Sequence, residues 1–87
     1  MNDQSLLQFP CDFPIKIIGD GGPEFGPMVL ELVRRHSPDL DETRISIRAS
    51  RAERYQSVTV MVTARDRAHL DALYQELSGH PQIRMVL

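Results

Sequence analysis

Apolar and polar residues alternate in four stretches of this chain, as they do in strands with one buried face. The four stretches are residues 13–19, 43–50, 55–64 and 82–87. In residues 55–64, for example, Val58, Val60, Val62 and Ala64 occupy every second position. We therefore predict four strands, each with one face toward a core.

Two further stretches have the period of a helix. Between Glu24 and His36 the apolar residues lie three and four positions apart, on one side of a helix. A second helix begins after Asp66, whose side chain can cap its first turn, and ends at Gly79 before Pro81. Its apolar stripe consists of Leu70, Leu73, Tyr74 and Leu77.

The order strand–helix–strand–strand–helix–strand predicts an α+β fold, a ferredoxin-like sandwich. Right-handed crossovers place both helices on one face of a four-stranded antiparallel sheet. Because 87 residues leave no room for a second core, we expect one domain over residues 1–87, with residues 1–12 as an extended lead-in. The other sheet face is left open, and we expect function or self-association there. Its predicted members are Lys16, Ile18, Arg44, Arg48, Thr59, Met61, Arg84 and Val86, with Tyr55 at the rim.

The bulk composition is that of a soluble globular chain, with 41% hydrophobic and 25% charged residues. The single cysteine, Cys11, excludes an intramolecular disulfide. No apolar run approaches the length of a membrane span, and the first residues lack the pattern of a secretory signal. We therefore expect a cytoplasmic protein that does not associate with membranes.

Positive charge is concentrated in one part of a chain whose net charge is −2. Residues 44–67 hold six arginines against Glu53 and Asp66, a local balance of +4. A solvated hairpin, a site for an anionic ligand and a surface for an acidic partner all fit this pattern. Arg44 and Arg48, if they share one strand face, are about 13 Å apart, which suits an acidic protein patch better than one carboxylate.

The remaining chemistry argues against nucleic-acid binding and catalysis. The outward positions that follow Tyr55 offer no aromatic platform for stacked bases, and the chain is acidic. His36, His69 and His80 are scattered, and we expect His69 to be an exposed residue of a first helical turn. Cys11 has no activating base near it in sequence. The sequence thus predicts no catalytic residue, no metal and no cofactor.

A glycine-rich stretch, GDGGPEFG over residues 19–26, joins the first strand to the first helix. Its backbone N–H groups could hold a carboxylate at the helix start, which makes Gly19, Asp20, Gly21 and Gly22 ligand-binding candidates. The alternative is a turn whose glycines serve backbone geometry alone.

Five segments in this order resemble the small bacterial YbeD family of uncharacterised proteins. They are FPCDFPIKIIG, RRHSP, RYQSVTVMVTA, LDALYQELSGHP and IRMVL. The resemblance runs from Leu7 to Leu87; it departs at Glu53, where a turn glycine is expected. It implies a ferredoxin-like fold similar to ACT domains, which bind amino acids or other small metabolites, and a loose association with lipoate metabolism. In ACT domains the corresponding strand-to-helix loop often lines the ligand site. The resemblance carries over no catalytic residue.

Together these features favour a small non-enzymatic regulatory module that binds a metabolite or docks on a metabolic enzyme. The alternative is an interaction adaptor without a ligand, which uses the arginine-lined hairpin on an acidic partner. The expected contacts of a homodimer are Ile18, Met61 and Val86 on the open face, rimmed by Tyr55 and Arg84, or else an edge strand.

Overall fold

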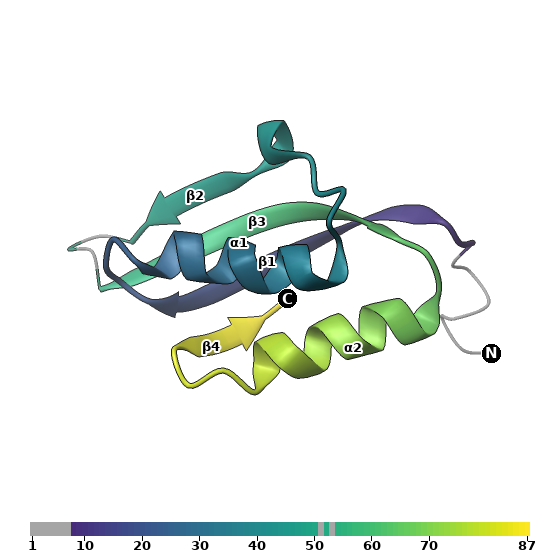
Figure 1. Cartoon of the computed structure of the whole chain (residues 1–87). Helices are drawn as coiled ribbons and strands as arrows, with labels where there is room; N and C mark the ends of the chain where they lie inside the picture. The colour runs from purple at the N-terminus through teal and green to yellow at the C-terminus, as the bar shows by residue number, and fades with distance from the viewer. Residues whose placement is uncertain (1–7, 51, 53) are drawn as a thin grey trace.

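The computed structural model describes residues 8–50, 52 and 54–87, and it confirms the predicted ferredoxin-like fold. The strands are β1 (Cys11–Asp20), β2 (Ser46–Ala49), β3 (Tyr55–Ala64) and β4 (Ile83–Val86). They form one antiparallel sheet in the order β2-β3-β1-β4. The helices α1 (Phe25–His36) and α2 (Arg67–Ser78) lie together on one face of it (Figure 1). Part of the expected lead-in, residues 1–7, and the turn residues Arg51 and Glu53 lie outside the described residues.

The core lies between the sheet and the two helices, and it is built from the predicted alternating positions. Ile15 and Ile17 of β1 and the three valines of β3 are fully buried. They pack with buried side chains of α1 and α2, among them Val33 and Leu73. Each such side chain contributes about 1.5–3 kcal/mol when it leaves water, so this layer dominates the stability of the fold.

The predicted second strand is shorter than expected, because a 3-10 helix, η2 (Glu42–Arg44), precedes it. The Asp41 carboxylate accepts hydrogen bonds from the Thr43 backbone N–H at 2.9 Å and from its hydroxyl at 2.6 Å. These bonds fix the turn and hold the pKa of Asp41 below its ordinary value. The prediction that Arg44 shares a strand face with Arg48 was therefore wrong. Arg44 instead lies in η2, where its guanidinium contacts Asp12 at 3.3 Å.

A bulge in the last strand corrects a second prediction, the placement of Val86 on the open face. The pairing shifts between Ile18 and Gly19 of β1, so that β4 holds one extra residue there. Val86 pairs with buried Ile17 and packs against the core, whereas Met85 pairs with Ile18. Paired residues point to the same sheet face, so Met85, which is 51% exposed, takes the open-face position.

Gly19 is the glycine on which the packing of α1 against the sheet depends. A Cβ atom at this position would lie 2.2 Å from Cε1 of Phe25 and 2.4 Å from the backbone oxygen of Gln82. The Phe25 ring is buried against the strand, and the Gln82 oxygen already accepts the Asp20 N–H. Neither atom can give way without disturbing the sheet or the helix.

We expect Gly19→Ala to lower the free energy of unfolding by about 3 kcal/mol, because overpacking here involves a backbone atom. Gly79→Ala is the control, since its Cβ would lie 3.3 Å from the nearest atom, the Gln75 oxygen. Urea unfolding of both variants measures the difference. Equal losses in the two proteins would contradict this role of Gly19.

Candidate functional site

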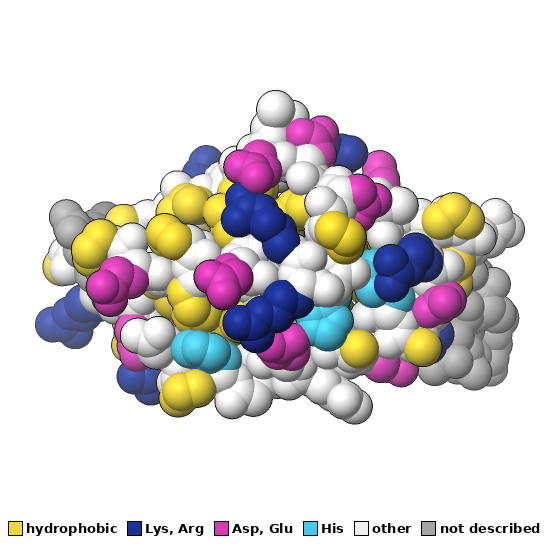
Figure 2. Space-filling model, in the orientation of Figure 1, with side chains coloured by type: hydrophobic (Ala, Val, Ile, Leu, Met, Phe, Trp, Pro, Cys, Tyr) yellow, Lys and Arg dark blue, Asp and Glu magenta, His cyan; other side chains and the backbone are white. Residues whose placement is uncertain are grey.

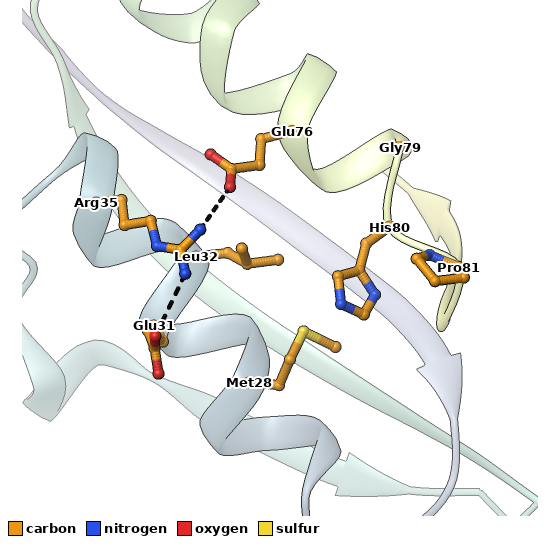
Figure 3. Close-up of a pocket in the computed structure, with 8 residues that line it drawn as sticks. All are labelled: Met28, Glu31, Leu32, Arg35, Glu76, Gly79, His80 and Pro81. Atoms are coloured by element: carbon orange, nitrogen blue, oxygen red, sulfur yellow. Dashed lines mark hydrogen bonds and ion pairs between the residues drawn. The ribbon is translucent and has the colours of Figure 1, made fainter.

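Two hollows on opposite faces of the molecule are candidates for a binding site. The first, here called the helix groove, has a volume of about 470 Å³ and lies between α1 and the end of α2. Figure 3 shows Met28 and Leu32 of α1 across from His80 and Pro81, which follow α2. The other lining residues are Glu31, Arg35, Glu76 and Gly79.

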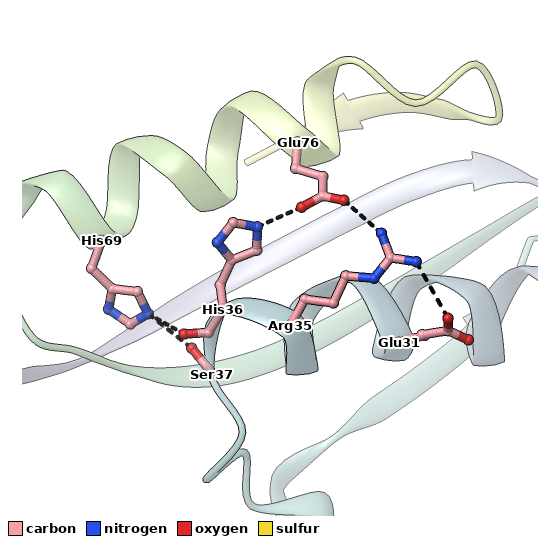
Figure 4. Close-up of polar contacts among 6 residues, drawn as sticks. All are labelled: Glu31, Arg35, His36, Ser37, His69 and Glu76. Atoms are coloured by element: carbon pink, nitrogen blue, oxygen red, sulfur yellow. Dashed lines mark hydrogen bonds and ion pairs between the residues drawn. The ribbon is translucent and has the colours of Figure 1, made fainter.

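The charged side chains of the helix groove neutralise one another. Arg35 contacts Glu76 at 3.0 Å and Glu31 at 3.4 Å, and His36 contacts the second oxygen of Glu76 at 2.5 Å (Figure 4). The hydrogen bond with His36, assisted by the charges of His36 and Arg35, holds the pKa of Glu76 below its ordinary value. Figure 2 shows the same mixture of both signs across the helix face. These ion pairs link α1 to α2, and they leave little unpaired charge in the helix groove for a ligand.

A buried histidine next to this cluster corrects the expectation that His69 is exposed, since only 6% of it is accessible. Its Nδ1 accepts the backbone N–H of Arg65 at 3.1 Å. The proton of the neutral ring therefore lies on Nε2, which donates to the carbonyl oxygen of His36 at 2.8 Å and lies 3.1 Å from the Ser37 hydroxyl (Figure 4). Because neither ring nitrogen is free to take a proton from Ser37, this pair is no activated nucleophile.

The second hollow, here called the sheet-face hollow, has a volume of about 310 Å³ and lies on the open face. Ile18 and Tyr55, which is 48% exposed, give it an apolar floor. Lys16 and Arg48 line it, and within the described residues neither has an acidic side chain at ion-pair distance. The remaining lining residues are Ala49, Ser50, Gln56 and Ser57.

The strand register explains how these cations come together. Arg48 of β2 pairs with Ser57 of β3, which pairs in turn with Ile18 of β1. Lys16 lies two residues before Ile18 and points to the same face. The backbones of β1 and β2 are separated only by β3, which makes them about 10 Å apart, so both long side chains can reach a ligand above Ser57.

At the end of the same face, Arg84 donates from Nε to the Asp20 carboxylate at 2.9 Å. Asp20 pairs with Tyr55, so this ion pair adjoins the sheet-face hollow. The predicted face residues thus fall into two groups. Lys16, Ile18, Arg48 and Tyr55 surround one hollow. The other predicted face residues do not line it: Arg44, Thr59, Met61, Arg84 and Val86.

The glycine-rich loop uses backbone groups to attach itself to its neighbours. Asp20 N–H donates to the Gln82 oxygen at 3.2 Å, and Gly21 N–H donates to the Arg54 oxygen at 3.0 Å. Gly22 has a φ of +140°, which only glycine adopts readily. Such hydrogen bonds within the fold agree with the alternative that the glycines of this turn serve backbone geometry alone. Ligand binding by Gly19, Asp20, Gly21 and Gly22 stays a prediction.

Metal binding has little support in the described part of the chain. No three side chains of the His, Cys, Asp or Glu type are arranged there to hold a metal ion. Cys11 is a partly exposed free thiol at the start of β1. Among the same residues, no helix is long and apolar enough to cross a membrane.

The family model described as "Protein of unknown function (DUF493)" matches residues 4–87. The chain is 44% identical over 87 residues to a UPF0250 protein of Nitrosomonas europaea, and the match covers 100% of both chains. It is 46% identical over 84 residues to a UPF0250 protein of Chromobacterium violaceum, covering 97% of this chain and 94% of the relative. A UPF0250 protein of Paraburkholderia phymatum is 41% identical over 85 residues, or 98% and 96% of the two chains. The chain belongs to this uncharacterised bacterial family, the one that the five quoted segments indicated.

We expect His69→Phe to lower the free energy of unfolding by about 2–4 kcal/mol, because the Arg65 N–H and the His36 carbonyl lose their common partner. His80→Phe, which removes one bond to the Gln82 N–H in an exposed turn, should cost less than about 1 kcal/mol. Chemical denaturation of both variants checks this. If His69→Phe leaves the free energy of unfolding nearly unchanged, water or the Ser37 hydroxyl satisfies these two backbone groups instead.

The Glu76 cluster predicts a pH dependence of stability. Because the folded-state pKa of Glu76 is lowered, the carboxylate stabilises the protein above its ordinary pKa of 4.5, and this contribution is lost as the pH falls through the folded pKa. Between about pH 6 and about pH 3, the wild type should lose more stability than Glu76→Gln. If the free energies of unfolding of the two proteins fall equally with pH over this range, Glu76 is not the source of the pH dependence.

Proposed function

We propose that this protein is a non-enzymatic regulatory module that binds a small carboxylate-bearing metabolite in the sheet-face hollow. One observation carries the proposal: Lys16 and Arg48 line one hollow and have no acidic partner among the described residues. A guanidinium and an ammonium are the groups that proteins use to hold carboxylates. A ligand carboxylate would supply the missing negative charge.

The rest of the hollow indicates the size and polarity of the ligand. A volume of about 310 Å³ is near the lower end of the range for small-molecule sites, so it suits a compact metabolite. Ile18 and Tyr55 offer apolar contact beneath the carboxylate, and Ser57 offers a hydroxyl. The ligand class that fits is therefore a short organic acid with an apolar portion. The likeness of the fold to ACT domains supports the same class, and the family's loose association with lipoate metabolism is compatible with it.

Docking on another protein is the second candidate function, favoured by apolar side chains that adjoin the hollow. Met85 is 51% exposed and Leu87 59% exposed. Leu87 exchanges backbone hydrogen bonds with Lys16, so its side chain lies on the open face with that of Lys16. Met85 lies on the same face because it pairs with Ile18. We propose that a second copy or a metabolic enzyme in the cytoplasm covers them.

The test is a thermal-shift and calorimetric screen of amino acids, 2-oxo acids and short fatty acids, each paired with its amide. We expect one or more acids, and none of the amides, to stabilise the protein by about 2.7 kcal/mol at a hundredfold excess over Kd. Lys16→Met and Arg48→Met should each abolish most of this effect. Arg65→Met is the matched control, because Arg65 is an exposed arginine outside the hollow.

Two results would overturn the proposal: no acid stabilises the wild type, or the Lys16 and Arg48 variants respond as the control does. Native mass spectra of the same samples report the oligomeric state, for which we expect a dimer. A monomer at all concentrations would remove the second copy as the partner of Met85 and Leu87.

A further inference from the structure

The two edges of the sheet differ in how well they can accept another strand. An edge strand presents unpaired N–H and C=O groups, and natural proteins block such edges with bulges, prolines or short strands. On one side the sheet ends at β4 and the uncovered first half of β1, and on the other side it ends at β2.

The edge formed by β1 and β4 carries two blocking features. Lys16 exchanges backbone hydrogen bonds with Leu87 at 2.8 and 3.0 Å, so its polar backbone groups point toward β4. The direction of the backbone N–H and C=O groups alternates from one residue to the next along a strand. The backbone of Pro14, two residues before Lys16, therefore faces the same edge, at a point that β4 does not cover. Pro14 has no N–H to donate to a neighbour. The remainder of this edge is β4 with its bulge.

The β2 edge is a short strand of four residues, as β4 is, but it has neither a proline nor a bulge. All four residues of β2 pair with β3 without a register shift, none is a proline, and all are exposed. Ser50 N–H donates to the Tyr55 oxygen at 2.8 Å, so alternation directs the backbone groups of Arg48 toward β3 and those of Ile47 and Ala49 outward. In Figure 1, β2 forms the rim of the sheet, with no further strand beyond it.

The side chains of β2 specify what an added strand would contain. Ile47 pairs with buried Val58 and lies on the helix side next to Gly26 of α1, yet it is 50% exposed. Arg48 points to the open face and has no acidic partner among the described residues. An added strand that matches β2 would place an apolar side chain beside Ile47 and an acidic one beside Arg48.

A second copy of the chain fits this edge poorly. In antiparallel self-pairing, the register centred on Arg48 sets two guanidinium groups directly opposite each other. The register centred on Ile47 places them diagonally on one face, about 7–8 Å apart. The surrounding residues 44–67 already carry a local charge of +4. Like charges across a strand pair destabilise it, whereas an acidic strand relieves this repulsion.

We propose that the β2 edge binds an extended segment of a partner protein by strand addition, and that acidic and apolar side chains alternate in this segment. The backbone of the segment pairs with Ile47 and Ala49, and its acidic side chains meet Arg48 on the open face. This is a mode of peptide recognition in which main-chain bonds give affinity and alternate side chains give specificity. It needs neither Lys16 nor a ligand in the sheet-face hollow, although Arg48 is common to both sites.

The test uses a blocked, fluorescently labelled synthetic hexapeptide of alternating Glu and Val, with fluorescence anisotropy as the readout. We expect it to bind more tightly than two control peptides, one with Lys in place of Glu and one with the Glu residues grouped together. In hydrogen exchange of the wild type, excess peptide should slow the amides of Ile47 and Ala49. Equal binding of the three peptides, or no change at these two amides, would overturn the proposal.

Substitutions localise the binding. Ile47→Pro removes an outward donor and should weaken binding by about two- to tenfold, the worth of one net hydrogen bond. Arg48→Glu should weaken it several-fold, while Arg65→Glu, which makes the same charge change away from β2, should not. Lys16→Met should bind the peptide as the wild type does, which separates this site from the metabolite hollow. If Ile47→Pro instead converts a dimer to a monomer in sedimentation experiments, a second copy occupies the edge and the proposal is wrong.

Discussion

The pairing of β1 with β3 is the interaction on which the rest of the structure depends. It runs without a break from Cys11 opposite Ala64 to Asp20 opposite Tyr55. One face of this ribbon supplies the aliphatic side chains of the core, and the other supplies Lys16, Ile18 and Tyr55 to the hollow. Because side chains alternate, a shift of one residue would exchange the two faces. The hydrophobic core therefore determines which side chains lie on the open face.

The strictness of this alternation is the reason why the fold was predictable from sequence. Both long strands and both helices have regular apolar periods, and an Asp at the start of α2 caps it as expected, accepting the His69 N–H at 2.8 Å. The misplacements arise where a local event breaks the period. Around Arg44, where a strand was predicted, an Asp-x-Thr turn begins the 3-10 helix η2. In β4, a bulge places Met85 on the open face and Val86 on the core face, the reverse of the prediction. Because Met85, Val86 and Leu87 are all apolar, the sequence does not show which of them faces the core.

The candidate sites were predictable only in part, since they combine residues that the sequence keeps apart. Alternation brought Lys16, Ile18 and Arg48 to the right face, but it could not join them to Ala49 and Ser50 in one hollow. His69 was misplaced for a similar reason. A histidine in a first helical turn is usually exposed, and here two backbone groups from other elements satisfy its ring. Such a pattern depends on tertiary packing, which neither composition nor period reveals.

The two faces also differ in what their charges do. On the helix face, Arg35 and His36 share Glu76, so charge is used within the fold. On the open face, Lys16 and Arg48 have no acidic partner among the residues that the structure describes, in a chain whose overall charge is negative. The ion pairs of the helix face stabilise the fold, whereas the sheet carries both of the binding sites that we propose.

The imidazole of His69 has a consequence for how the domain opens. It joins the carbonyl at the end of α1 to the N–H of Arg65 that follows β3, and so it connects the strand–helix–strand halves of the chain through one buried ring. Unravelling of the end of α1 removes the His36 carbonyl from the Nε2–H of His69, and unravelling of the start of α2 leaves that carbonyl without its donor. Local unfolding of the end of α1 is thereby coupled to that of the start of α2, and the two halves form one cooperative unit rather than two.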